Sequence, residues 1–190
     1  MKKKFVFPLV MATVGTCLLV AAAFAGGAAN AAPSAKAKAE ARGGVLRMDS
    51  RSDFDYIDPQ LAYFSHTWQM GNAVNLRLLS YPDKDGEAGT RLVAEAATGM
   101  PTVTSDGKSY TFTVKNGFKF SDGSPVTAAN FAASINRALD PKMQSPASSF
   151  VEDIVGAKDV LAGKATAASG VKATGQRLSI KLATVAPDFL

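Results

Sequence analysis

The stretch 110–141 constrains the fold more than any other part of this 190-residue sequence. Tyr110, Phe112 and Val114 alternate with polar residues, and this period of two predicts a strand with one buried face. Three pairs that end in glycine favour tight turns around it, because glycine tolerates positive φ: Asp106-Gly107, Asn116-Gly117 and Asp122-Gly123. The sequence therefore predicts a strand bounded by turns.

A helix is predicted directly after these turns, over residues 128–139. Thr127 stands at the expected N-cap, where its hydroxyl can accept from the free amides of the first turn. Asn130 occupies the position at which a capping box has Glu or Gln, so the box is imperfect. Asp140-Pro141 ends the helix. The apolar residues recur on one helical face: Phe131, Ile135, Ala138 and Leu139.

The first 31 residues have the composition of a secretory signal peptide. Lys2–Lys4 form a basic start, and an apolar run follows from residue 5 to residue 25. Two Ala-x-Ala triplets provide cleavage sites, one after Ala31 and one after Ala25. We expect cleavage after Ala31, with Ala25 as the alternative, and therefore export from the cytoplasm.

Two other fates of this segment compete with cleavage. The apolar run approaches the length of a spanning helix, so it also fits an uncleaved membrane anchor. Cys17, the only cysteine, raises the alternative of lipoprotein processing, although Val14-Gly15-Thr16 matches the usual preceding pattern poorly. Cleavage would leave a chain without cysteine, which excludes disulfides and thiolate chemistry.

The net charge of +5 belongs to the N-terminal end of the chain. Lys2–Lys4 contribute three positive charges, and residues 32–44 contribute two more, because three basic residues there face one Glu. Residues 45–190 are therefore neutral and lack the basic excess that is typical of nucleic-acid binding. The 32–44 stretch has no apolar residue larger than Ala or Pro, which predicts a flexible linker.

Residues 45–190 have the pattern of a globular domain. The apolar residues of 45–48 predict a first strand. Asp58-Pro59 predicts a loop, and residues 66–79 predict a helix with Trp68 on its apolar face.

Two further elements are predicted in the C-terminal third of the chain. Ser149 and Glu152 match a capping box, which predicts a short helix. Gly156 is expected to break it and Gly163 to end the following turn or helix. Apolar and polar residues alternate over 178–182, which predicts a second half-buried strand.

Several motifs occur in a fixed order along the chain: Gly43–Arg47, Asp58-Pro59, Tyr81-Pro82-Asp83, Leu92–Ala96, Tyr110–Ala128 and Pro187–Leu190. This order resembles the extracytoplasmic solute-binding proteins of family 5, which feed peptides, nickel and similar solutes to ABC importers. The resemblance implies a mixed α/β fold, the N-terminal part of the first lobe of a two-lobed periplasmic-binding-protein-like (type II) fold. Residues 45–190 would then be a partial first lobe that is truncated at its C-terminus.

The resemblance also implies a function. The protein would be the substrate-binding component of an ABC importer, capturing a peptide-like or other small solute by cleft closure and delivering it to a membrane permease. It would be periplasmic or on the outer face of the cytoplasmic membrane, a monomer when full length, and without cofactor or metal. The alternative is a secreted, non-catalytic structural or interaction domain.

The resemblance places the candidate ligand-binding residues in two loops. Tyr63, Phe64 and Ser65 follow Asp58-Pro59, where the family lines its cleft, and Ala147 and Ser148 follow a Ser-Pro pair that resembles a loop facing the ligand. An acidic residue in the first loop can hold a peptide's amino terminus in some relatives, but here the loop is aromatic. The alternative is that the aromatic residues pack in the interior.

For Trp68, on the apolar face of its predicted helix, interior packing is the expectation.

An enzyme finds little support in the sequence. His66 is the only histidine and no Gly-x-Ser-x-Gly nucleophile motif occurs, so a serine-type triad has no basis. The acidic residues near the loop lack the glycine and distal glutamate of a calcium site, and they are interpreted as solvated loop acids: Asp49, Asp53, Asp55 and Asp58.

Overall fold

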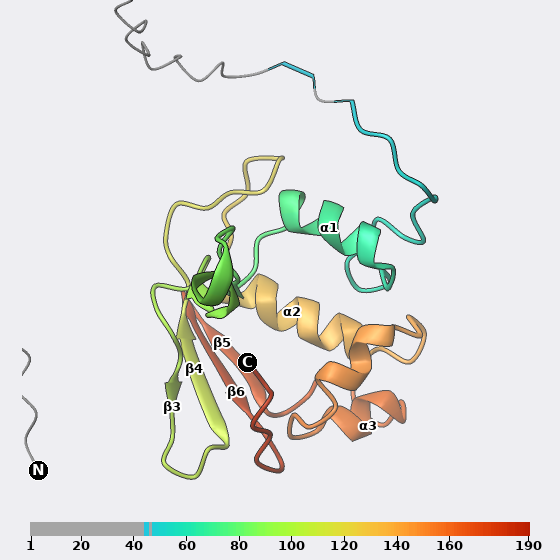
Figure 1. Ribbon diagram of the computed structural model, residues 1–190. Helices are drawn as coiled ribbons and strands as arrows, with labels where there is room; N and C mark the ends of the chain where they lie inside the picture. The colour runs from blue at the N-terminus through green and yellow to red at the C-terminus, as the bar shows by residue number, and fades with distance from the viewer. Residues whose placement is uncertain (1–43, 46) are drawn as a thin grey trace, which may run out of the picture. The chain divides into compact units, whose positions relative to one another are not determined.

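The computed structural model describes residues 44–45 and 47–190 (Figure 1). The predicted signal peptide, its two cleavage positions, Cys17 and all of the predicted linker except Gly44 lie outside these residues. Residues 48–190 form one structural unit. Within the described residues, no helix has the length and apolar character needed to cross a membrane.

A four-stranded antiparallel sheet forms the centre of this unit. Its strands are β3 (Thr102–Val103), β4 (Ser109–Thr113), β5 (Val171–Thr174) and β6 (Arg177–Lys181), in the order β3-β4-β6-β5. In the central pair, Phe112 lies opposite Leu178 and Tyr110 opposite Ile180. All four side chains are buried, which confirms the two alternating patterns read from the sequence. Strand β5 was not predicted.

The turns around β4 have the predicted chemistry. Gly107, with φ +67°, lies in the hairpin between β3 and β4, and Gly123, with φ +85°, lies in a turn closed by the Gly123 N–H bond to the Phe120 carbonyl. A side chain is strained at such φ values, so these glycines are required by the backbone.

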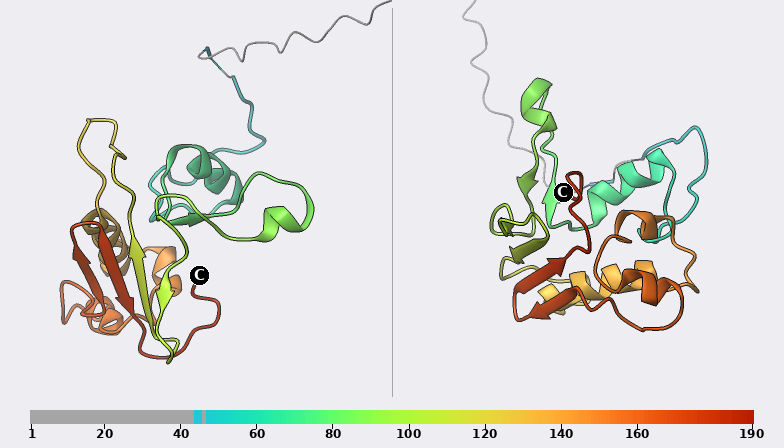
Figure 2. Two further views of the ribbon diagram at one scale, coloured as in Figure 1. Left: turned by 90° about the vertical axis from the view of Figure 1, so that its left-hand side faces the viewer. Right: turned by 90° about the horizontal axis from the view of Figure 1, so that it is seen from below.

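Helix α2 (Ala128–Leu139) confirms the predicted helix. The Asn130 side-chain oxygen accepts from the Thr127 backbone N–H at 2.7 Å and from its hydroxyl at 3.0 Å, so Asn fulfils the role of the missing Glu. The helix contacts β5 and β6, and Figure 2 shows it lying along one face of the sheet. Its buried Leu139 belongs to the same apolar core as Phe112 and Leu178.

The segment after α2 differs from its prediction. A 3₁₀ helix, η2 (Pro146–Phe150), begins at Ser145, whose hydroxyl accepts from the Ala147 N–H at 3.1 Å. Ser149 instead donates to the Pro146 carbonyl, so the capping box predicted at this residue is not formed. The helix starts at Pro146, before the predicted start at Ser149, because serine suits the N-cap and proline suits the first helical position.

Helix α3 (Ala157–Leu161) begins after Gly156, which has φ +84° and separates it from η2, as predicted. Ile154 precedes it and forms an isolated bridge with Leu182, which extends the core beyond β6.

The N-terminal part of the unit contains helix α1 (Ser65–Val74), a two-stranded sheet of β1 (Leu79–Ser80) and β2 (Val93–Ala94), and the 3₁₀ helix η1 (Gly86–Thr90). The helix predicted over 66–79 is therefore too long. Asn75 has extended backbone angles, and the carbonyls of Arg77 and Leu78 accept from the Ala96 and Glu95 amides. Pairing with a distant strand thus outweighs the local helical pattern.

The described residues of the first strand predicted over 45–48, which are 45, 47 and 48, lie in no strand. Val45 and Met48 are 86% and 82% exposed, and no segment in the described part of the chain pairs with this stretch. A strand needs a neighbour to satisfy its backbone, so an apolar pattern alone does not produce one.

Candidate functional site

The loop over residues 53–64 and the first turn of α1 hold the first group of predicted ligand-binding residues. It turns at Asp58-Pro59, where the Asp58 carbonyl accepts from the Leu61 and Ala62 amides at 3.0 and 2.9 Å. The Asp58 carboxylate also accepts from the backbone N–H of Gln60 at 3.0 Å. This turn is the loop predicted from the Asp-Pro pair, and it brings the chain back toward the start of α1.

Asp55 holds the return of the loop in place. Its carboxylate accepts from the Tyr63 and Phe64 amides at 2.6 and 2.9 Å and from the Thr67 hydroxyl at 2.6 Å. Limited access to water raises the pKa of Asp55, but the bonds from the Thr67 hydroxyl and from the Tyr63, Tyr56 and Phe64 amides lower it by more. The net pKa lies well below the ordinary aspartate value, and Asp55 is ionised at neutral pH.

Asp58 fastens the loop to α2. Arg137 donates to both carboxylate oxygens, at 2.9 Å for Nη1 to Oδ1. This bond lowers the pKa of Asp58 and raises that of Arg137. Asp55 and Asp58 were interpreted as solvated loop acids. Both are partly exposed, but they also accept structural bonds, Asp55 from two backbone amides and Thr67, and Asp58 from Arg137.

Gln60 links this loop to the second candidate loop. Its side-chain amide donates to the Ser134 hydroxyl on α2 at 2.7 Å, and its carbonyl accepts from the buried Ser145 hydroxyl. Ala147 and Ser148 follow in η2 and are partly buried. The structure therefore connects the two predicted loops, and the connection is made by Ser145. The Ser-Pro pair is a sequence signal for this residue, since it is typical of a helix start.

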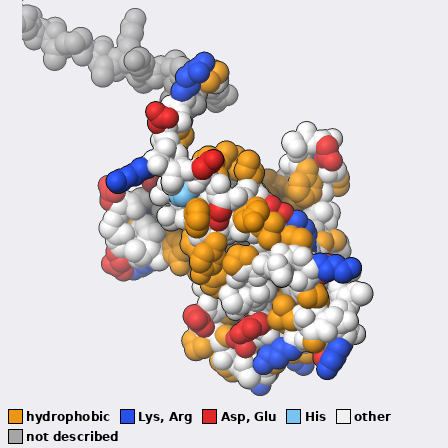
Figure 3. All heavy atoms as spheres, turned by 90° about the vertical axis from the view of Figure 1, so that its right-hand side faces the viewer, with side chains coloured by type: hydrophobic (Ala, Val, Ile, Leu, Met, Phe, Trp, Pro, Cys, Tyr) orange, Lys and Arg blue, Asp and Glu red, His pale blue; other side chains and the backbone are white. Residues whose placement is uncertain are grey.

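The aromatic side chains of the loop lie at the surface. Tyr63 is 55% exposed, Phe64 53% and Trp68 46%, and Ser65 is exposed as well. Trp68 was expected in the interior, and this expectation is wrong. Helix α1 has one buried residue, Thr67, so its apolar side chains cover no core. Figure 3 shows hydrophobic side chains gathered around the single histidine.

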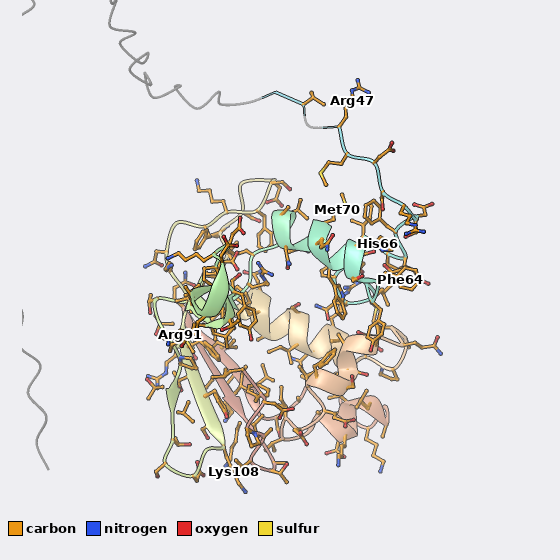
Figure 4. All side chains as sticks on the ribbon, in the orientation of Figure 1. Arg47, Phe64, His66, Met70, Arg91 and Lys108 are labelled. Atoms are coloured by element: carbon orange, nitrogen blue, oxygen red, sulfur yellow. The ribbon has the colours of Figure 1, made fainter. Side chains whose placement is uncertain are left out.

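Contacts between rings order this surface. Tyr63 meets Trp68 edge-on with ring centroids 5.5 Å apart, and the Trp68 indole donates to the Ala62 carbonyl at 2.9 Å. The His66 ring centroid lies 5.6 Å from the ring centroid of Phe54 and 5.5 Å from that of Phe64. Figure 4 places Phe64 and His66 at the beginning of α1 and Met70 further along it.

His66 is held to the backbone by one ring nitrogen, which lies 2.6 Å from the Asp53 carbonyl. No serine or cysteine nucleophile is bonded to it among the described residues, so the structure adds nothing to an enzymatic interpretation. Those residues also contain no group of three or more His, Cys, Asp or Glu side chains that could hold a metal ion.

A hollow of about 170 Å³ opens beside Trp68. Its apolar lining comes from Ile57, Pro59, Ala62 and Trp68. Its polar lining comes from Thr67, Asn72, Asn75 and Arg77, and Gly71 of α1 completes it. The sequence analysis did not find this hollow, because its lining comes from the loop, from α1 and from the chain after α1.

Comparison with known proteins identifies the class. A family model described as bacterial extracellular solute-binding proteins, family 5 Middle, matches residues 91–190. This match covers more than half of the chain, and the chain therefore belongs to family 5 of the bacterial extracellular solute-binding proteins. The predicted family and its mixed α/β fold are confirmed, and the family is one of solute-binding proteins.

Individual relatives support the same class. The chain is 32% identical over 154 residues to YgiS of Escherichia coli K12, named as a probable deoxycholate-binding periplasmic protein, over 76% of this chain and 27% of YgiS. It is 38% identical over 88 residues to the periplasmic oligopeptide-binding protein OppA of the same organism, over 44% of this chain and 16% of OppA.

A solved structure agrees with these relatives. The murein tripeptide binding protein MppA of Escherichia coli superimposes with a TM-score of 0.62 at 30% identity, over 72% of this chain and 26% of MppA. The matched segments thus span about a quarter of YgiS and of MppA, and less of OppA.

Proposed function

We propose that this protein is the extracytoplasmic substrate-binding component of an ABC importer. It captures a peptide-like or other small solute in a cleft that closes over it, and it hands the solute to a membrane permease. Residues 1–31 serve as the signal peptide and 32–44 as a linker, so that 45–190 act outside the cytoplasmic membrane as part of the first lobe. Family membership and the surface of the Tyr63–Phe64 loop support this proposal.

One observation carries the assignment of the site. The Tyr63 and Phe64 rings are exposed, whereas the backbone amides of both residues are held by Asp55. Exposed aromatic rings on a flexible loop would lose conformational entropy on binding, but rings on a fixed backbone lose little. Covering these rings with a solute is favourable, because it removes apolar area from water. Binding clefts use such apolar area together with a few polar groups.

The relatives suggest the range of solutes. YgiS is named as a probable deoxycholate-binding protein and OppA as an oligopeptide-binding protein, so the names of these relatives include both a bile acid and peptides. The aromatic loop suits either class, because it offers apolar area. Two carboxylates of this loop, Asp55 and Asp58, are already bonded within the protein.

The test compares aromatic residues inside and outside the loop. We expect Tyr63→Ala and Phe64→Ala to weaken solute binding by about 1–3 kcal/mol, the usual loss for a buried aromatic contact. The controls Tyr81→Ala and Phe120→Ala remove rings that are 60% and 46% exposed elsewhere. Calorimetry with bile acids and with defined di- to oligopeptides measures binding, and thermal melting checks folding.

Cellular uptake tests the transport role. Radiolabelled solute should enter cells that carry the intact gene, and uptake should fall when the gene is deleted and return with the unaltered gene but not with Tyr63→Ala. Binding that is equal in the loop and control variants would contradict the assigned site. Unchanged uptake after deletion would contradict the transport role and favour the secreted interaction domain.

A further inference from the structure

The hollow beside Trp68 has a rigid aromatic side. The indole is held by its bond to the Ala62 carbonyl at 2.9 Å and by the edge of Tyr63, whose ring centroid is 5.5 Å away. Trp68 is nevertheless 46% exposed. A ligand ring that packs on this indole therefore finds it already oriented, and little side-chain entropy is lost on binding.

The charged groups around the hollow are already paired. The Arg77 guanidinium donates to Glu95 at 3.2 Å, to Ser80 at 2.9 Å and to Asn72. On the loop side, Asp55 accepts from Thr67, another lining residue. A charged ligand group would lose its water without gaining a free counter-charge, which is unfavourable. The hollow therefore favours an uncharged group.

The size of the hollow matches a single ring. Its volume is about 170 Å³, and an apolar protein cavity of about 150 Å³ holds one benzene molecule. Asn75 lines the hollow, and its side-chain nitrogen lies 3.3 Å from the position that a β-carbon on Gly71 would take. A ring substituent such as a hydroxyl would find a polar partner there.

We propose that the hollow lined by Ile57, Pro59, Ala62 and Trp68 is a subsite for one uncharged aromatic ring of the captured solute. The proposal rests on the proposed function, because it places this ring beside the Tyr63–Phe64 loop that holds the rest of the solute. It adds a substrate class, which is solutes or peptides that carry a phenyl or phenol group.

Gly71 provides a direct test. It lies within α1 and lines the hollow, and a β-carbon built on it meets only the end of the flexible Asn75 side chain, at 3.3 Å. Gly71→Leu places a side chain in the space of the ring, and Leu favours helix more than Gly does. Ala133→Leu, at an exposed position of α2, is the matched control.

The probe is p-cresol, which is uncharged at neutral pH because phenols ionise near pH 10. Trp68 is the only tryptophan and lines the hollow, so its fluorescence reports binding in the hollow or directly beside it, and the Gly71 variant separates the two. We expect p-cresol to change the emission saturably, Gly71→Leu to weaken this binding roughly tenfold or more, and Ala133→Leu to leave it unchanged. Benzylamine and benzoate, which carry charges, should bind more weakly than p-cresol.

Several results would overturn the subsite. They are an emission that p-cresol does not change, equal affinity in Gly71→Leu and the parent, and charged probes that bind as tightly as p-cresol. If Gly71→Leu does not fold, Gly71→Ala decides in its place, since its smaller side chain should still reduce the affinity measurably.

Solute binding that depends on Tyr63 but not on Gly71 would overturn the subsite and leave the proposed function standing. Ring binding without any solute uptake would overturn the proposed function instead.

Discussion

The segment 48–78, which contains α1 and is called the α1 segment below, and the four-stranded sheet are stabilised in different ways. Between residues 48 and 78, Ala62 and Thr67 are the only buried residues, whereas the other buried hydrophobic residues of the described chain all lie at or after Ala96. The sheet and α2 share an apolar core around Phe112 and Leu178. The α1 segment is held instead by hydrogen bonds of Asp55 and Gln60 and by the ion pair between Asp58 and Arg137.

This difference suits the proposed function. A binding surface must keep its rings exposed until the solute arrives, so those rings cannot also form the core that fixes the backbone. Polar bonds fix it without covering the rings. The consequence is that the geometry of the candidate site depends on the ionisation of a few side chains, whereas the sheet depends on apolar burial. The predictions below are arranged to separate the two.

The largest effect is expected in the sheet. Leu178 is fully buried opposite Phe112, and Leu178→Ala should lower the free energy of unfolding by about 2–5 kcal/mol, because it leaves a cavity. Urea unfolding followed by circular dichroism measures the loss. The exposed neighbour Arg177 serves as control, and Arg177→Ala should change stability by less than about 0.5 kcal/mol. Equal losses in the two variants would contradict an apolar core at this position.

Acid and Asp55→Asn should act on the α1 segment and not on the sheet. Because the folded-state pKa of Asp55 lies below its unfolded value, its stabilising contribution is full above about pH 4 and is lost as the pH falls below that. Asparagine has one acceptor oxygen and cannot accept from Tyr63, Phe64 and Thr67 in the same way. We therefore expect Trp68 emission in Asp55→Asn at neutral pH to resemble that of the parent in acid.

The same variant should leave the far-ultraviolet circular dichroism of the sheet nearly unchanged. If Trp68 emission of Asp55→Asn matches the parent at neutral pH, the loop is held by other contacts and the polar account of this region fails.

The smallest effect is expected for the link between the two regions. The Asp58 and Arg137 side chains are 30% and 47% exposed, so water screens their ion pair. Arg137→Gln should therefore lower the free energy of unfolding of the segment around Trp68 by about 0.2–1 kcal/mol, and by less in high salt. Arg91→Gln is the comparison, since Arg91 pairs with its neighbour Glu87 at a fully exposed site and links no distant segments. Thermal melts followed at Trp68 should shift for Arg137→Gln and not for Arg91→Gln.

The sequence predicted the elements whose cause is local. Alternation at Tyr110–Val114 and at 178–182, and the N-cap at Thr127, correspond to β4, β6 and α2, because each pattern acts within one turn or one strand. The family followed from the order of such motifs. For the candidate site, the sequence indicated Tyr63, Phe64 and Ser65 through the resemblance, and their role in binding stays a prediction.

The tertiary structure decided what depends on distant partners. Helix α1 ends at Val74 because Leu78 pairs with Glu95, which is distant in the sequence. The exposure of Trp68 likewise depends on which residues pack over α1. The bonds that Arg137 donates to Asp58 and Ser145 donates to Gln60 join residues about eighty positions apart. Composition and periodicity carry no record of such pairs, because hydrogen bonds and burial are set by distance in space.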